Sequence, residues 1–273
     1  MPDLSLLFIL LLVVAAIAYF AWPHYTLRKA LAEPFPQEWR RVLMHNLPVY
    51  RRMPTDLQLQ LKQRIKQFLH EKHFTGCAGL TVTDEMRVTI AACACLLLLN
   101  RKTGVYPGLR YILVYPEAFM VERDAVDETG MAGTHKHGLL GESWDNGKVI
   151  LSWADVIRGS RDEADGNNVA LHEFAHQLDH ESGATNGAPL LGSAASYKRW
   201  ARVLTAEFEA LQRAAYQGDE TLLDYYGATE PAEFFAVVTE VFFERPQELA
   251  QRHPALFEQL QGYFRVNPGE WRD

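Results

Sequence analysis

The chain has 273 residues, 48% hydrophobic and 22% charged, a composition typical of a folded globular protein. Its formal net charge of −7 argues against direct nucleic-acid binding, which needs clustered lysine and arginine to neutralise phosphates. Three cysteines cannot all pair, and Cys93 and Cys95 lie in an apolar run. This pattern predicts buried free thiols and a reducing compartment, and zinc ligation by this pair is the weaker alternative because no second pair accompanies it.

The first predicted element is an N-terminal transmembrane helix. Residues 4–22 read LSLLFILLLVVAAIAYFAW, uncharged and just long enough to cross about 30 Å of hydrocarbon, with Tyr19 and Trp22 as interfacial anchors. A cleaved signal peptide is the alternative, but no positive charge precedes the run and no small-residue cleavage site follows it. We therefore expect an anchor over residues 1–23 and a juxtamembrane segment over 24–54.

The distribution of basic residues predicts the orientation of this anchor. No lysine or arginine precedes the apolar run, and six follow it before the first predicted soluble helix: Arg28, Lys29, Arg40, Arg41, Arg51 and Arg52. Because positive charge is retained on the cytoplasmic side, we expect a single pass through the inner (cytoplasmic) membrane with the large C-terminal part in the cytoplasm.

Residues 55–273 are expected to form one α+β domain. Apolar spacing predicts an amphipathic helix from Thr55 to about His73, a turn at Thr75-Gly76, and a buried helix from Asp84 to Asn100. Segments 110–121 and 148–153, rich in β-branched and aromatic residues, predict strands of a small sheet. An edge strand such as 148–153 is a candidate for pairing with an extended peptide.

The sequence NNVALHEFAHQLDH (167–180) contains the candidate site. Asn167 or Asn168 can cap a helix that begins near Val169, and His172 and His176, four residues apart, then lie on one face of it. Two such imidazoles can bind one zinc ion, while the carboxylate of Glu173 can take a proton from water. The alternative is that this His-Glu-x-x-His pattern occurs by chance, because the chain contains ten histidines.

A third ligand has to come from elsewhere. Asp179 and Ser182 occupy the positions where the long metzincin motif requires glycine and histidine, which excludes that class. Asp179 is a candidate for orienting a ligand or for hydrogen bonding at the helix end. A helix predicted between Pro231 and Pro246 carries Glu233, which is either a ligand or a first-turn residue that favours the helix dipole. Glu240 lies on the same stripe, and we expect it near the site or on the surface, with direct ligation of the metal as the weaker alternative.

These residues also resemble a known family. LHEFAHQLD, followed about sixty positions later by EPAEFFAVVTEVFF, with two tyrosines shortly before it, is similar to the Mlc titration factor A family of bacterial zinc-dependent peptidases. The catalytic core of that family is related to anthrax lethal factor protease. The similarity covers most of residues 35–260 and includes LSW at 151–153 and GAPLL at 187–191. The N-terminal anchor is a departure, because the family's familiar member is soluble.

The resemblance implies a zincin-like metallopeptidase domain. It implies that His172, His176 and Glu233 ligate Zn²⁺, that Glu173 activates water, and that Tyr226, rather than Tyr225, stabilises the oxyanion. The implied partner is a peptide or protein substrate, with aminopeptidase-like specificity suggested by the family alone.

Two further expectations remain open. The family's namesake role predicts an alternative function, a regulatory protein that sequesters a transcriptional repressor such as Mlc, with catalysis secondary. His135 and His137 lie in a Gly-rich loop, where a second metal site is the alternative to ordinary exposed histidines.

Overall fold

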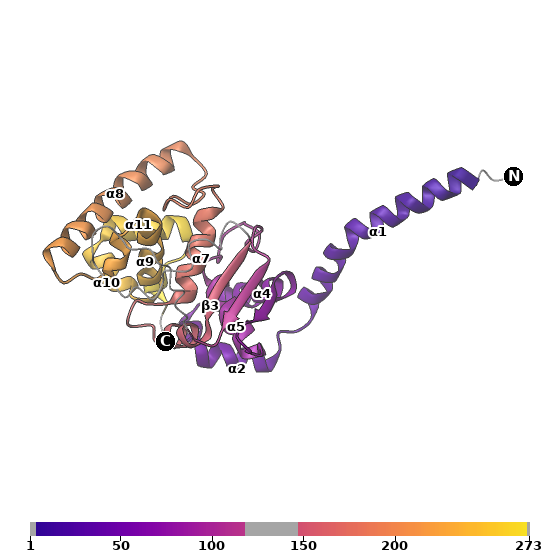
Figure 1. The fold of residues 1–273 in the computed structure, drawn as a ribbon, viewed down its shortest axis with the longest axis horizontal. Coiled ribbons are helices and arrows are strands. Elements are labelled where there is room, and N and C mark those ends of the chain that lie inside the picture. Colours follow the sequence, from indigo (N-terminus) through magenta and orange to yellow (C-terminus); the bar gives the residue numbers. More distant parts are fainter. Residues whose placement is uncertain (1–3, 118–146, 272–273) are drawn as a thin grey trace.

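The computed structural model describes residues 4–117 and 147–271. They form a mixed, mostly helical domain with a small parallel sheet and a long helix, α1 (Leu4–Ala32), that projects from one side (Figure 1). α1 is followed by α2 (Gln37–Asn46), α3 (Val49–Arg52) and α4 (Thr55–Glu71). The N-terminal and C-terminal halves of the domain meet where α7 (Val169–His180) packs on α9 (Pro231–Glu244).

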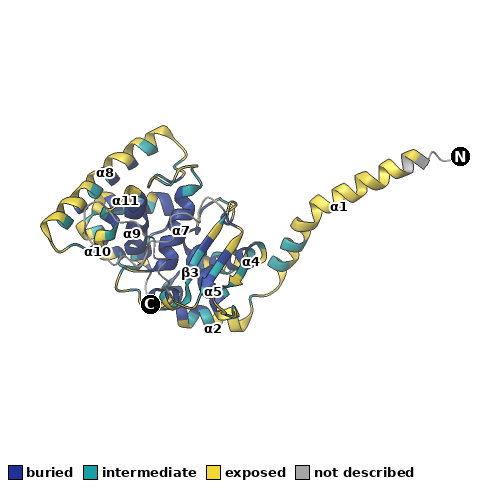
Figure 2. Cartoon of the chain, viewed as in Figure 1, coloured by how far each residue is buried: buried dark blue, intermediate teal, exposed yellow. Residues whose placement is uncertain are grey.

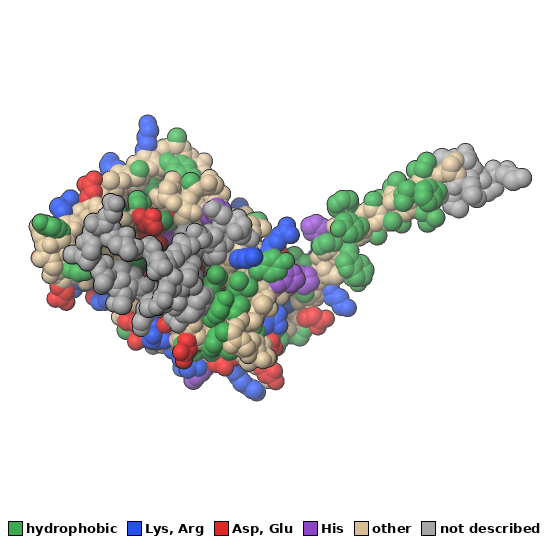
Figure 3. Space-filling model, in the orientation of Figure 1, with side chains coloured by type: hydrophobic (Ala, Val, Ile, Leu, Met, Phe, Trp, Pro, Cys, Tyr) green, Lys and Arg blue, Asp and Glu red, His purple; other side chains and the backbone are tan. Residues whose placement is uncertain are grey.

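α1 differs from the rest of the chain in its exposure. Most of the helix is exposed (Figure 2), and apolar side chains such as Phe8, Ile17 and Trp22 project from it; Figure 3 shows apolar groups along much of its length. A 25-residue stretch, Phe8–Ala32, is long and apolar enough to cross a membrane, and an 18-residue window of it has a mean hydropathy of 1.8. The helix runs ten residues beyond the predicted end at Trp22, with Pro23 inside it.

The extension of α1 is held against α4. Lys66 on α4 donates from Nζ to the backbone carbonyls of Leu31, at 2.6 Å, and Glu33. These contacts satisfy carbonyls at the C-terminal end of α1 that have no partner within the helix. Leu43 of α2 and Tyr50 of α3 lie in the same hydrophobic core as α4, so much of the segment 24–54 packs with the domain. The division at residue 55 stays a prediction.

The sheet contains three strands in the order β1-β2-β3, all parallel: β1 (His73–Gly76), β2 (Tyr111–Tyr115) and β3 (Lys148–Ser152). The second and third strands match the predicted segments, although β2 ends at Tyr115. The first strand stands where the sequence predicted a turn, and this prediction was wrong. Thr75 and Gly76 resemble a turn locally, but pairing with Leu113 and Val114 holds them extended.

The central helices match the predictions closely. α5 (Asp84–Leu96) is buried almost all round and ends four residues before Asn100, with Leu97, Leu98 and Leu99 continuing into the core. Cys93 and Cys95 are fully buried within it, as predicted, and burial raises the pKa of the Cys93 thiol to about 12. The shorter α6 (Trp153–Arg161) follows β3 and leads to α7.

The C-terminal part is a helical layer behind α7. It contains α8 (Ala194–Gln217), the short η2 (Tyr225–Ala228), α9, α10 (Pro246–Arg252), α11 (Pro254–Phe264) and η3 (Pro268–Glu270). α9 is buried from Ala232 to Phe243, and its Phe235 packs against the rings of Trp200, Tyr263 and Phe264. This apolar packing fixes α9, and therefore its two buried glutamates, against α7.

Candidate metal centre

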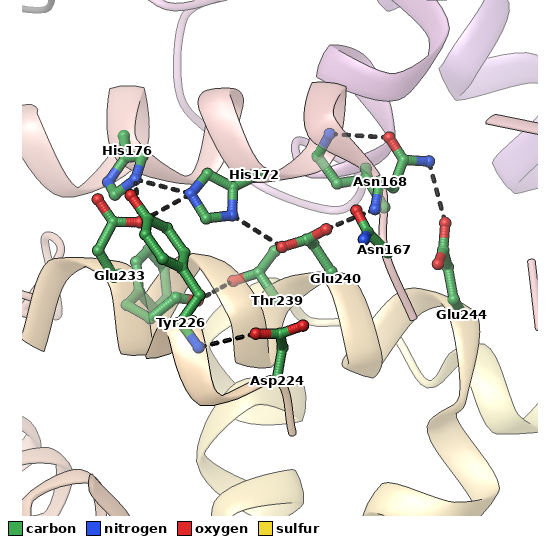
Figure 4. A network of polar contacts seen from close by, with 12 residues as sticks. Asn167, Asn168, His172, His176, Asp224, Tyr226, Glu233, Thr239, Glu240 and Glu244 are labelled. Carbon is green, nitrogen blue, oxygen red and sulfur yellow. Dashed lines mark hydrogen bonds and ion pairs between the residues drawn. The ribbon is translucent and has the colours of Figure 1, made fainter. Parts of the chain in front are cut away.

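α7 is positioned by a cap at its N-terminus. The Asn168 side chain accepts a hydrogen bond from the Leu171 backbone N–H at 3.1 Å, as expected for a capping residue. From this start, His172 and His176 lie one turn apart on one face, with ring centroids 4.9 Å apart. The face looks toward α9, where Pro231 occupies the first turn and places Glu233 opposite the two rings (Figure 4).

Three potential ligand atoms converge between the two helices. Glu233 Oε2 lies 2.9 Å from His172 Nε2 and 3.4 Å from His176 Nε2, and the two imidazole nitrogens are 3.2 Å apart. The three ligand atoms all lie within 4.8 Å of one another, and all three residues are buried. Of the residues that the structure describes, these are the ones grouped closely enough to hold a metal ion. The role of each as a ligand stays a prediction.

The surroundings of His172 fit a metal ligand. Its Nδ1 lies 2.7 Å from Glu240 Oε1, and the other oxygen of Glu240 accepts the backbone N–H of Asn168. A carboxylate at Nδ1 favours the tautomer that carries its proton there, which leaves the Nε2 lone pair directed at the site. With that tautomer, Nε2 and the Glu233 carboxylate are two acceptors that face each other at 2.9 Å, a contact that a bound cation or a second proton on the ring satisfies.

The electrostatics of the site also favour a cation. Burial alone would lower the pKa of His172, but the carboxylates of Glu240 and Glu233 outweigh it and raise that pKa well above its ordinary value. Burial would raise the pKa of Glu233, yet hydrogen bonds with His172 and His176 hold it well below its usual range. The donor set of two imidazoles and one carboxylate is the kind that zinc takes at catalytic sites.

Two further predicted residues lie at the same place. Glu173 is on α7 beside His172 and is 1% exposed. Tyr226 in η2 lies with its ring 6.0 Å from the His172 ring (Figure 4). Burial, then Glu233 and Glu173, raises the pKa of the Tyr226 phenol well above its usual value, which keeps the hydroxyl protonated as a hydrogen-bond donor. Tyr225 instead hydrogen-bonds the Asp219 carbonyl and is 40% exposed.

Sequence reasoning missed part of the support for the site. Asn168 was considered only as a cap, but its side-chain amide also donates to Glu244 at 3.0 Å, while its backbone binds Glu240. Glu240 and Glu244 occur at helical spacing after Glu233, which is the signal that was available. Asp179 forms a hydrogen bond at the helix end, one of the two roles predicted for it, since its Oδ2 accepts the Gly187 backbone N–H at 2.6 Å. His135 and His137 lie outside the described residues.

The fold and the site together define a candidate metal centre of the metallopeptidase kind. The family model of the glucose-regulated metallo-peptidases M90 matches residues 22–265. The chain belongs to this metallopeptidase family.

Curated relatives agree with this assignment. Mlc titration factor A of Pectobacterium atrosepticum is 32% identical over 237 residues, which cover 85% of this chain and 87% of that protein. Mlc titration factor A of Klebsiella pneumoniae subsp. pneumoniae is 33% identical over 84% of this chain and 86% of that protein. An uncharacterized protein of Synechocystis sp., slr2042, is 39% identical over 98% of both chains. The resemblance seen in the sequence is confirmed.

Proposed function

We propose that this protein is a zinc-dependent metallopeptidase with a zincin-like site, which hydrolyses peptide bonds in a peptide or protein substrate. The observation that carries the proposal is the convergence of His172, His176 and Glu233 from two buried helices, with Glu173 on the same helix as the histidines. Membership of a metallopeptidase family supports it. Aminopeptidase-like specificity is the form of the activity to test first.

In the proposed mechanism each side chain has a separate role. His172, His176 and Glu233 would hold the ion, and Glu240 keeps the His172 ring oriented through Nδ1. A bound zinc ion supplies a Lewis acid that polarises the scissile carbonyl and lowers the pKa of water. Glu173 accepts the proton of the attacking water and delivers it to the leaving amine. The protonated Tyr226 hydroxyl donates a hydrogen bond to the developing oxyanion.

We further propose that α1 anchors the protein in the inner (cytoplasmic) membrane as a single pass, with the domain in the cytoplasm. The exposed apolar surface of α1 and the basic residues that follow it support this location. Membrane fractionation of cells that express the full chain, followed by carbonate extraction and protease treatment of inverted vesicles, tests it. Release by carbonate would contradict an anchor, and protection from protease would contradict the cytoplasmic orientation.

Hydrolysis by the full chain in detergent tests the peptidase proposal. A panel of chromogenic aminoacyl and peptide substrates is offered to the wild type, to a chelator-treated sample and to Glu173→Gln. Loss of a general base is expected to lower the rate about 10²- to 10⁴-fold, while bound zinc is unchanged. Glu209→Gln, an exposed position on α8, is the matched control and keeps full activity. A Glu173→Gln variant as active as the wild type would contradict the mechanism.

A second function is favoured by the relatives. Two of the relatives that match most of this chain carry the name Mlc titration factor A. A regulatory protein that sequesters a repressor such as Mlc needs no turnover. If the wild type carries one zinc ion, remains folded and hydrolyses nothing, this second function replaces the first. If Glu173→Gln loses hydrolysis but keeps repressor binding, the two activities are independent.

A further inference from the structure

A cavity of about 450 Å³ lies between the N-terminal part of α8, the C-terminal part of α11 and the loop that follows α5. Its lining contains four basic side chains, Arg101, Lys102, Arg199 and Arg265, and one carboxylate, Glu258. The whole chain, in contrast, has a net charge of −7. Basic residues are therefore concentrated in a cavity of a protein that is otherwise acidic.

Within the described part of the chain, none of these four positive charges forms a salt bridge. In residues 4–117 and 147–271, no carboxylate comes within 4.0 Å of a side-chain nitrogen of any of the four basic residues. Like charges that line one cavity repel each other, and a partly enclosed site screens that repulsion less than open solvent does. An anion in the cavity relieves this repulsion.

The walls of the cavity are held in place by hydrogen bonds. Arg64 on α4 donates to the backbone carbonyls of Arg101, at 2.6 Å, and Thr103, at 2.8 Å. Asn100 donates from its side chain to the carbonyl of Arg265 at 3.0 Å. Arg265 ends α11 in the left-handed conformation, with φ of 59°. The loop and the helix end are thus fixed relative to each other before a ligand arrives, which lowers the cost of binding.

Arg101 is the most strongly fixed of the four basic residues. Its guanidinium lies 4.5 Å from the centre of the Tyr263 ring, and Nη1 donates to the Tyr263 hydroxyl at 2.9 Å. The residue is only 8% exposed, so its charge is largely removed from water. A planar guanidinium held in this way suits the paired oxygens of a phosphate group. The other three basic residues are exposed and lie around it.

We propose that this cavity binds a small molecule that carries a phosphate group. Phosphate monoesters carry between one and two negative charges at neutral pH, which matches a cluster of four basic side chains better than a single carboxylate does. The volume of about 450 Å³ is within the range of small-molecule sites and leaves room for an organic part beside the phosphate. The buried Trp200 supplies an apolar wall for that part.

The cavity is distinct from the candidate metal centre. None of His172, Glu173, His176 and Glu233 lines it. Its wall includes Leu190, Leu191 and Gly192, the continuation of the loop that Asp179 holds through the Gly187 N–H. Binding at the cavity can therefore be measured without any turnover, so its failure and the failure of the proposed peptidase function are separate results.

Isothermal titration calorimetry on the full chain in non-ionic detergent, at constant salt, tests the proposal. The probes are ribose 5-phosphate and inorganic phosphate, with ribose as the uncharged control. We expect one saturable site for ribose 5-phosphate and none for ribose. Arg199→Gln and Lys102→Gln are each expected to weaken binding about tenfold, because each removes a charge that contacts the anion. Both side chains are exposed, so neither change is expected to disturb folding.

Arg202→Gln is the matched control, since Arg202 is exposed on the same helix but does not line the cavity. It should bind as the wild type does. The proposal is overturned if neither phosphate probe saturates the wild type at concentrations up to roughly 10 mM. It is also overturned if Arg202→Gln weakens binding as much as Arg199→Gln, or if both cavity variants bind as tightly as the wild type.

Discussion

The contact between Glu240 and His172 allows a sharp test of how the site is held. Glu240 accepts two hydrogen bonds at once, from His172 Nδ1 at 2.7 Å and from the Asn168 backbone N–H. The Glu240→Gln variant has only one amide oxygen, so one of these two donors must face the amide NH₂ group. A buried donor without an acceptor costs about 1–3 kcal/mol. Since about 1.4 kcal/mol is a factor of ten, zinc affinity is expected to fall about 10- to 100-fold.

Competition with a chromogenic chelator, on the full chain in detergent, measures this affinity. Glu244→Gln is the matched control one turn further along α9. Burial raises the pKa of Glu244 to about 9, so glutamine resembles its neutral form and can still accept from the Asn168 side chain. This variant is expected to bind zinc as the wild type does. Equal affinities for Glu240→Gln, Glu244→Gln and the wild type would refute the inference that Glu240 orients a metal ligand.

Three further results are expected. Tyr226→Phe should lower kcat about 10²-fold or more with little change in KM, as removal of one oxyanion donor does, and a kcat equal to that of the wild type would exclude this role. Burial raises the pKa of Asp179 to about 6, so its ionised form is disfavoured in the folded state. Urea unfolding of chelated samples should therefore show the wild type losing about 2–3 kcal/mol relative to Asp179→Asn as pH rises from about 4 to about 6, and parallel pH profiles would contradict this. An added Cβ at Gly187 would lie 2.4 Å from the Pro231 carbonyl oxygen, whereas Gly192 has the same φ of 77° and nothing nearby. Gly187→Ala should thus lower the thermal midpoint more than Gly192→Ala, and equal effects would assign the whole cost to the backbone conformation.

The sequence predicted those parts of the molecule that local patterns determine. Asn168 as a cap and Pro231 in a first turn gave the starts of α7 and α9, and the spacing of the histidines gave one face of the site. The membrane-type helix was found from its apolar run, but the sequence did not predict its last ten residues, whose end Lys66 of α4 contacts at the Leu31 carbonyl. Lys66 lies more than thirty residues from the carbonyls that it binds, so no local sequence pattern indicates this contact.

What the sequence could not show depends on which segments meet in space. The strand β1 exists because β2 pairs with it, although its own four residues indicate a turn. The partners of Glu240 and Glu244 lie on a helix about seventy positions earlier. The basic cavity draws on three separate stretches of chain, around Arg101, Arg199 and Arg265, and each stretch alone reads as an ordinary solvated surface.

The division of the site between α7 and α9 has a consequence for biosynthesis. The two histidines leave the ribosome about sixty residues before Glu233 does, and α9 packs between helices that flank it on both sides in the sequence. Because chains fold progressively from the N-terminus as they are made, the complete ligand set can form only when almost the whole polypeptide has been synthesised. A chain terminated before Tyr226 would lack Tyr226 and Glu233 together. The order of translation therefore delays assembly of the candidate metal centre until the protein is nearly finished.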